Sequence, residues 1–196
     1  MQSSTVSDKA ALRDLVVSRR SVSPKRLIAP GPTPAEVEEM VRAAVAAPDH
    51  KGLRPVRFVV IPTDRRHDLA RAFIDAKRER DPAASEDDLR RAGEKAFRGP
   101  LLIAIVLRIE RDHPRVSVSD QMMTAGAAAQ NMLLTAAALG YGACLRSGAS
   151  ATSRKVRQAL GIAASEELAA FMIVGTSTET TQRARVIDIS GMLENW

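Results

Sequence analysis

Three short clusters of basic and hydroxyl side chains carry the chemistry that this sequence suggests. The clusters are Arg19-Arg20-Ser21, the turn PDHK at residues 48–51 with His50 and Lys51, and Arg146-Ser147-Gly148. Guanidinium groups with a hydroxyl beside them suit a phosphate, because they supply several charge-assisted hydrogen bonds to a dianion. Each cluster follows an apolar segment that should be buried. We therefore expect the three clusters to lie on a fixed rim and to bind an anion.

Each cluster also has a simpler explanation. Arg19 and Arg20 could stabilise the negative end of a helix, an effect of ~0.3–1 kcal/mol, and for this pair taken alone that is the stronger explanation. His50 and Lys51 could be two solvated residues of a turn. Arg146 could be the partner of a surface carboxylate.

Other catalytic and metal-binding patterns are missing. The sequence GYG at 140–142 begins like a dinucleotide fingerprint, but it lacks the third glycine and follows a predicted helix. There is no P-loop and no Gly-x-Ser-x-Gly nucleophile motif. His50, His67 and His113 are far apart and lack nearby ligand partners, so we expect no metal site. The single cysteine, Cys144, excludes an internal disulfide and is expected to be an inert core residue.

The composition indicates one domain over residues 1–196, with 45% hydrophobic and 27% charged residues. The net charge of +6 and the pI near 10.1 favour an anionic partner, which could be nucleic acid, a membrane surface or a phosphate-bearing small molecule. Aromatic residues make up only 3%, which weighs against stacking on single-stranded nucleic acid. Acidic residues interrupt the basic segment 65–98, so we expect a mixed, solvated helical face there. A basic nucleic-acid-binding module is a remote alternative.

The ends of the chain and its apolar runs predict a cytoplasmic protein without membrane contact. The first residues lack the pattern of a secretory signal. The longest aliphatic run, Leu101 to Leu107, is far shorter than the ~20 residues of a membrane helix. We expect residues 1–6 to be disordered. The tail 178–196, which ends in Trp196, should be either disordered or wrapped on a partner subunit.

The first half of the chain predicts helices and one strand. Ser7 can cap a helix whose apolar stripe, formed by Leu12, Leu15 and Val16, ends at Arg19. The sequence TPAE at 33–36 predicts a capping box, and Pro48 stops the helix that it begins. That helix has one apolar face, formed by Val37, Met40, Val41, Ala44 and Val45. A strand over 56–62 and helices from 63 or 64 onward and over 85–97 follow.

The second half predicts the centre of the fold. Residues 100–109 are apolar on both faces, as expected of a central, doubly covered strand. The Ala- and Met-rich segment 118–139 predicts a central helix that is buried nearly all round. A short strand and loop over 141–150, a helix near 152–160 and a last core strand over 168–177 complete the chain.

The ordered set of motifs resembles a known family. SRRSVS, then AAPDHKGLRPVRFVVI, LGYGACLRSGA and VGT are similar, over residues 8–176, to the small NAD(P)H nitroreductase-like branch of the FMN-dependent nitroreductase family. The resemblance implies an α+β sandwich with a central mixed β-sheet around a long buried helix. It also implies a homodimer with two FMN sites at the subunit interface, each built from both subunits.

The resemblance also implies roles for particular residues. Arg19, Arg20 and Ser21 would bind the phosphate and ribityl end of FMN, and His50, with Lys51 beside it, would reach the flavin bound mainly by the other subunit. Leu145, Arg146 and Ser147 would line the cofactor from the opposite side, where Gly148 allows close backbone approach. The stretch that corresponds to a pyridine-nucleotide site comprises Thr135, Ala136, Ala137, Ala138, Leu139 and Gly140. Arg183 and Arg185 are additional candidate phosphate partners.

The implied activity is an FMN-dependent oxidoreductase. Hydride would pass from NADH or NADPH to FMN and then to a nitroaromatic, a quinone or a similar small acceptor, so no catalytic side chain is expected. Relatives often carry tryptophan at the positions of Val56 and Leu145, and close relatives can carry arginine at that of Ala46. These departures leave an alternative open, a flavin- or nucleotide-binding or storage protein of the same fold without efficient turnover.

Overall fold

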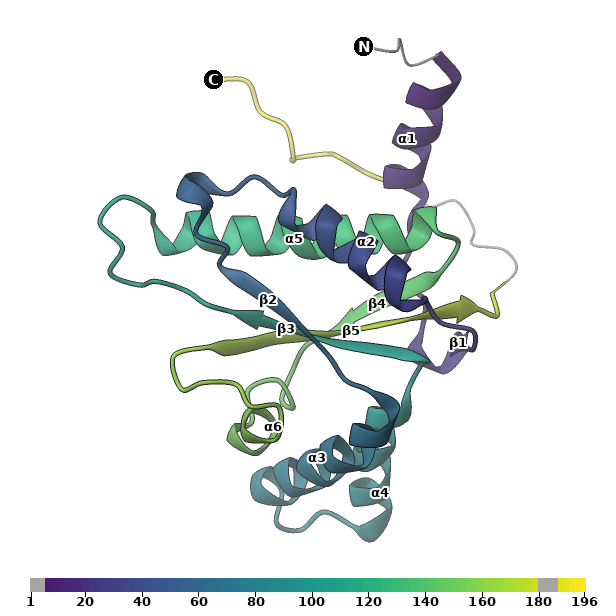
Figure 1. The fold of residues 1–196 in the computed structure, drawn as a ribbon, viewed down its shortest axis with the longest axis vertical. Helices are drawn as coiled ribbons and strands as arrows, with labels where there is room; N and C mark the ends of the chain where they lie inside the picture. The colour runs from purple at the N-terminus through teal and green to yellow at the C-terminus, as the bar shows by residue number, and fades with distance from the viewer. Residues whose placement is uncertain (1–5, 180–186) are drawn as a thin grey trace.

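The computed structural model describes residues 6–179 and 187–196, and its centre is a five-stranded sheet (Figure 1). The strands are β1 (Leu27–Ile28), β2 (Val56–Val60), β3 (Leu101–Leu107), β4 (Gly142–Arg146) and β5 (Glu167–Ser177). Their order is β1-β5-β3-β2, and β4 also pairs with β5. All these pairs are antiparallel. Among the described residues, parallel pairing is limited to an isolated bridge between Ser21 and Ala143, so the sheet is antiparallel and not mixed as the resemblance implied.

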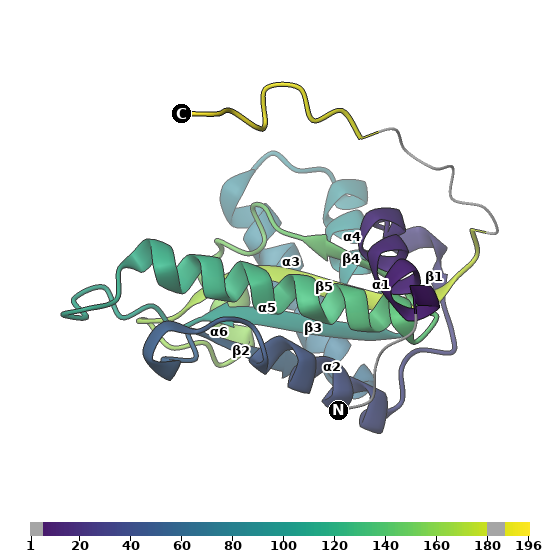
Figure 2. The ribbon, with the colours of Figure 1, turned by 90° about the horizontal axis from the view of Figure 1, so that it is seen from above.

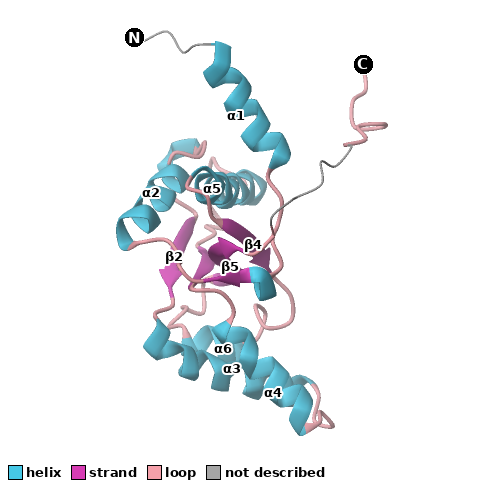
Figure 3. Cartoon of the chain, turned by 90° about the vertical axis from the view of Figure 1, so that its right-hand side faces the viewer, coloured by secondary structure: helices cyan, strands magenta, loops and turns pink. Residues whose placement is uncertain are grey.

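Helices cover both faces of the sheet, which confirms the α+β sandwich. The helices are α1 (Val6–Ser18), α2 (Pro34–Val45), α3 (Arg66–Arg80), α4 (Glu86–Glu94), α5 (Val118–Ala138) and α6 (Arg154–Ala159). Figure 3 shows α2 and α5 on one side of the sheet, α3, α4 and α6 on the other, and α1 projecting from the body. In the part of the chain that the structure describes, no helix is both long and apolar enough to span a bilayer.

The strand β3 forms the middle of the core, as its sequence predicted. Each of its seven residues is buried. Because side chains alternate along a strand, Ile103 packs toward α2 and α5, whereas Leu102 packs toward α3 and α6. The two faces therefore carry two separate apolar clusters, and the sheet divides the molecule into two layers.

Side-chain caps mark the starts of three of the six helices in the described residues, α2, α4 and α5. The Thr33 hydroxyl accepts a hydrogen bond from the Glu36 N–H, and the Glu36 carboxylate accepts one from the Thr33 N–H at 2.7 Å, which completes the capping box. The Ser85 hydroxyl caps α4 by accepting a hydrogen bond from the N–H of Asp88. The predicted cap at Ser7 is wrong, because α1 begins at Val6 and Ser7 lies inside it.

The prediction that the central helix is buried nearly all round is wrong for the single chain. One face of α5 is open to solvent, with Met122 47% and Met123 66% exposed. The stripe of α1 is open as well, since Leu12 is 65% exposed. Apolar sequence predicts that a helix face will be covered, but it does not say that the same chain supplies the cover.

The described part of the C-terminal tail, residues 187–196, contains neither helix nor strand. It extends away from the body (Figure 2), and its apolar side chains, including Ile189 and Trp196, are exposed. The candidate phosphate partners Arg183 and Arg185, like residues 1–5, lie outside the described residues.

Candidate functional site

The structure places the first and third basic clusters along the same strand, β4. After α1 ends at Ser18, the chain runs beside β4, where Ser21 forms a parallel bridge with Ala143. The Val22 N–H donates to the carbonyl of Ala143 at 3.1 Å. Because the bridge is parallel, Arg19 and Arg20 lie toward the start of β4, whereas Leu145 and the third cluster lie at the other end of the strand.

The two arginines of the first cluster have different surroundings. Arg20 donates from Nη1 to the carbonyls of Val17 (2.7 Å) and Arg19 (2.9 Å), which is the simpler role, stabilisation of a helix C-terminus. Nη1 of Arg19 is buried without a hydrogen-bond partner among the described residues. Buried polar groups are nearly always bonded, so this guanidinium is suited to an anion that the chain itself does not supply.

The end of β4 presents successive residues to opposite faces of the sheet. Cys144 packs in the cluster on the α3 and α6 side, and Arg146 lies beside its thiol; burial raises the pKa of Cys144 and the guanidinium opposes that shift. Leu145 is 39% exposed. Gly148 follows at φ +112°, and a side chain there would meet no atom within 4 Å. The loop after β4 therefore offers open backbone to a ligand.

The turn of the second cluster is organised by an acidic residue that the sequence had not singled out. The carboxylate of Asp49 accepts from the N–H groups of Leu53 (3.1 Å) and Arg54 (2.7 Å). These bonds hold a turn in which Lys51 and Arg54 have positive φ, at 67° and 50°. An aspartate that bonds the backbone a few residues ahead is a common turn signal, and it could have revealed this role.

The second cluster lies far from the other two within one chain. The Thr124 hydroxyl, in the N-terminal half of α5, donates to the carbonyl of Pro48 at 2.9 Å. His50 lies near Asp120, a residue in the same half of α5 as Thr124. The pKa of Asp120 is lowered mainly by hydrogen bonds from Ser117, with a smaller contribution from the positive charge of His50.

The first cluster lies at the opposite end of α5. The Tyr141 N–H, next to the Ser21 bridge, bonds to the carbonyl of Ala136 in the last turn of that helix. At 1.5 Å per residue, Thr124 and Gly140 are about 24 Å apart along α5. One chain therefore does not bring His50 and Arg19 to the same ligand.

The segment 135–140 forms the last turn and cap of α5. The Thr135 hydroxyl donates to the carbonyl of Asn131. Ala136 is fully buried in the core, whereas Ala138 and Gly140 are exposed. Only part of this segment is thus accessible to a ligand in the single chain.

The three histidines have separate surroundings. Nδ1 of His113 accepts a hydrogen bond from the Val116 N–H at 2.9 Å, and His67 packs edge-on against Phe97. Within residues 6–179 and 187–196, no three His, Cys, Asp or Glu side chains are placed to hold a metal ion together.

Comparison with known proteins identifies the class that this fold and these clusters define. Residues 16–176 match the Nitroreductase family. The "Putative NAD(P)H nitroreductase YdjA" of Escherichia coli K12 is 36% identical over 165 residues, which cover 83% of this chain and 86% of YdjA. The chain belongs to the nitroreductase family.

Solved structures agree with this assignment at the level of the fold. A nitroreductase-like family protein from Bacillus cereus superposes with a TM-score of 0.77 at 18% identity, covering 100% of this chain and 98% of that protein. A Desulfovibrio desulfuricans protein solved in complex with FMN gives a TM-score of 0.70 at 24% identity, covering 94% and 96% of the two chains.

Proposed function

We propose that the protein is an FMN-dependent NAD(P)H oxidoreductase that acts on a nitroaromatic, a quinone or a similar small acceptor. The observation that carries the proposal is the buried Nη1 of Arg19, which has no partner among the described residues and lies two residues before the bridge from Ser21 to β4. Family membership and the name of the YdjA relative support the activity, and the FMN complex of the Desulfovibrio desulfuricans protein supports the cofactor.

The residues present fit an FMN phosphate and its neighbouring chain. Arg19 would donate to the phosphate, with Arg20 and the Ser21 hydroxyl beside it. Leu145, Ser147 and the open backbone at Gly148 would line the cofactor beyond the phosphate. Bound FMN supplies the hydride and electron transfer between nicotinamide and acceptor. The protein positions the cofactor and supplies positive charge.

A second copy of the chain would complete the site. The open face of α5, the exposed stripe of α1 and the exposed apolar tail support a homodimer, because monomers seldom leave such surfaces uncovered. If two α5 helices pack antiparallel, His50 and Lys51 of one subunit approach Arg19 and Ser147 of the other. This arrangement would remove the separation of about 24 Å between the clusters of one chain.

The test combines the visible absorption spectrum of the purified protein, its oligomeric mass in solution and an assay of NADH or NADPH oxidation. We expect the purified protein to be yellow with a flavin absorption spectrum, to sediment as a dimer, and to consume NADH or NADPH steadily when a quinone is supplied. A yellow dimer that does not oxidise either nucleotide would favour the flavin-binding or storage function. Colourless, monomeric protein that stays without flavin in excess FMN would overturn the proposal.

A further inference from the structure

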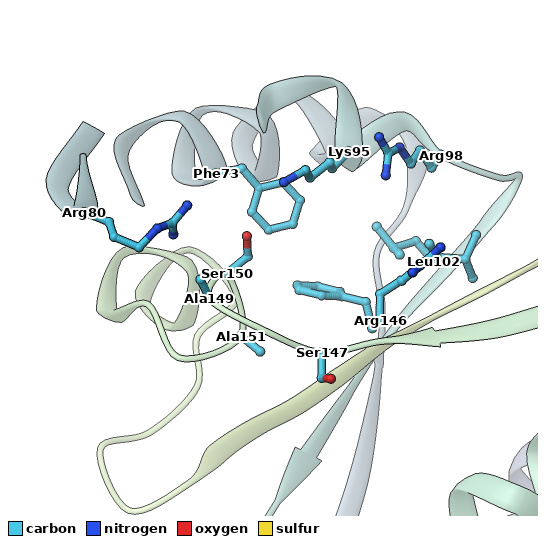
Figure 4. A pocket seen from close by; sticks show the side chains of 12 residues that line it. Phe73, Arg80, Lys95, Arg98, Leu102, Arg146, Ser147, Ala149, Ser150 and Ala151 are labelled. Carbon is cyan, nitrogen blue, oxygen red and sulfur yellow. The ribbon is translucent and has the colours of Figure 1, made fainter. Parts of the chain in front are cut away.

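A cavity lies on the side of the sheet away from α5. It has a volume of about 320 Å³ and lies between the sheet, α3, the end of α4 and the loop after β4. Figure 4 shows side chains reaching it from the helical layer and from the strand end. Of the residues that the resemblance assigned to the flavin, only Arg146 and Ser147 line this cavity, and its other walls come from residues that the proposed function does not use.

Most basic residues of the segment 65–98 are already paired. Arg66 donates to the carbonyls of Gly99 (2.6 Å) and Pro100 (2.8 Å). The residues that form ion pairs with nearby carboxylates are Arg65, Arg71, Lys77, Arg78, Arg90 and Arg91. This confirms the mixed helical face predicted for the segment. Apart from Arg66, the cations of the segment that have no carboxylate partner in the described chain are Arg80, Lys95 and Arg98.

These three cations line the same cavity, where Arg146 joins them from β4. Among the residues that the structure describes, no carboxylate lines the cavity. Asp81, the residue after Arg80, is bound by Lys77 at 2.5 Å, and this bond is the main cause of the lowered pKa of Asp81, with a smaller contribution from the charge of Arg80. Burial lowers the pKa of Lys95, and the charges of Arg98, Arg80 and Lys77 lower it further. The positive charge that lines the cavity therefore exceeds the nearby negative charge, and an anion there would relieve the repulsion.

The floor of the cavity is apolar. Phe73 of α3 and Phe171 of β5 meet edge to face with ring centroids 5.5 Å apart, and Leu102 and Ile173 extend the floor. A solvated cluster of surface cations needs no such floor. A ligand that fits both the cations and the apolar floor has a small apolar body and a strongly anionic group.

We propose that this cavity binds a small aromatic anion, a single ring bearing a doubly charged group such as a phosphate. The cations Arg80, Lys95, Arg98 and Arg146 hold the charged group, and the ring lies on the Phe73 and Phe171 floor. The volume of about 320 Å³ is at the lower end of ligand pockets and suits one ring better than a dinucleotide.

Titration calorimetry with phenyl phosphate tests the proposal. Saturating FMN is present throughout, so that the phosphate site proposed at Arg19 is filled. We expect binding that weakens with salt, and weaker binding of inorganic phosphate, which lacks the ring, and of neutral benzyl alcohol, which lacks the charge. Lys95→Met and Arg98→Met should each weaken phenyl phosphate binding about tenfold or more, since each removes a charge-assisted bond.

Two controls separate this cavity from other sites. Lys155→Met removes an exposed cation of α6 that does not line the cavity, and it should leave the affinity unchanged. Arg19→Ala should also leave it unchanged, which distinguishes the cavity from the proposed flavin site. Circular dichroism of each variant checks folding. The proposal would be overturned if phenyl phosphate did not bind, or if inorganic phosphate bound as tightly as phenyl phosphate. It would also be overturned if correctly folded Lys95→Met and Arg98→Met bound phenyl phosphate as tightly as the unmodified protein.

Discussion

Replacing Arg19 with alanine should separate cofactor binding from stability. Nη1 of Arg19 is buried, and its guanidinium makes no hydrogen bond or ion pair with the described residues. The variant therefore removes no bond that holds the chain together, and the free energy of unfolding of the apoprotein should change by less than about 1 kcal/mol. Loss of a charge-assisted bond to a phosphate should cost about 1.5–3 kcal/mol, or roughly 10- to 150-fold in Kd for FMN.

The assay is titration of FMN into apoprotein, followed by flavin fluorescence, together with urea unfolding of the same samples. Arg78→Ala is the matched control, because Arg78 is an exposed arginine of α3 whose pairing with Asp75 spans 3.7 Å. Equal Kd values for Arg19→Ala and Arg78→Ala would refute the phosphate assignment. A loss of more than about 2 kcal/mol of stability in Arg19→Ala alone would show that Arg19 is structural.

Three further perturbations test other parts of the structure. Arg57 holds the pKa of Glu166 at about 2, so Glu166→Gln should lower the free energy of unfolding by about 2–3 kcal/mol at pH 7. This difference should shrink as the pH falls from about 4.5 toward 2 in urea titrations. Gly99→Ala should destabilise by about 1–3 kcal/mol more than Gly161→Ala in the same titrations: both glycines have positive φ, but only the new Cβ at 99 collides with β5. Met123→Glu should convert a dimer to a monomer in sedimentation velocity, because Met123 is 66% exposed on the open face of α5.

Each of these predictions has an outcome that contradicts it. The same loss of stability in Glu166→Gln at pH 7 and at pH 3 would mean that the carboxylate charge is irrelevant. Equal destabilisation by Gly99→Ala and Gly161→Ala would mean that a collision with β5 does not contribute to the loss of stability. A Met123→Glu protein that sediments like Gln158→Glu, a control on the exposed surface of α6, would mean that the face of α5 is not the interface.

Local features were predictable because they depend on neighbours in the sequence. The capping box of Thr33 and Glu36 needs only residues three apart. The burial of both faces of β3 follows from an unbroken apolar run. Even the resemblance to the nitroreductase family rests on short motifs in a fixed order. The Ser7 cap failed because helix ends are weakly specified by sequence.

Distances across the fold were not predictable, because they depend on packing between remote segments. The amino-acid sequence by itself determined the strand and helix types, the three basic clusters and the family. Only the tertiary structure decided that Arg19 lies near the start of β4 and the C-terminal end of α5, while His50 lies near the other end of α5. It also decided that Arg80, Lys95 and Arg98 line one cavity together with the apolar side chains of Phe73 and Phe171. The physical reason is that helix caps and hydrophobic periodicity depend on residues a few positions apart. Strand pairing depends on segments far apart in the chain, and, in the proposed dimer, burial of the exposed face of α5 depends on a second copy of it.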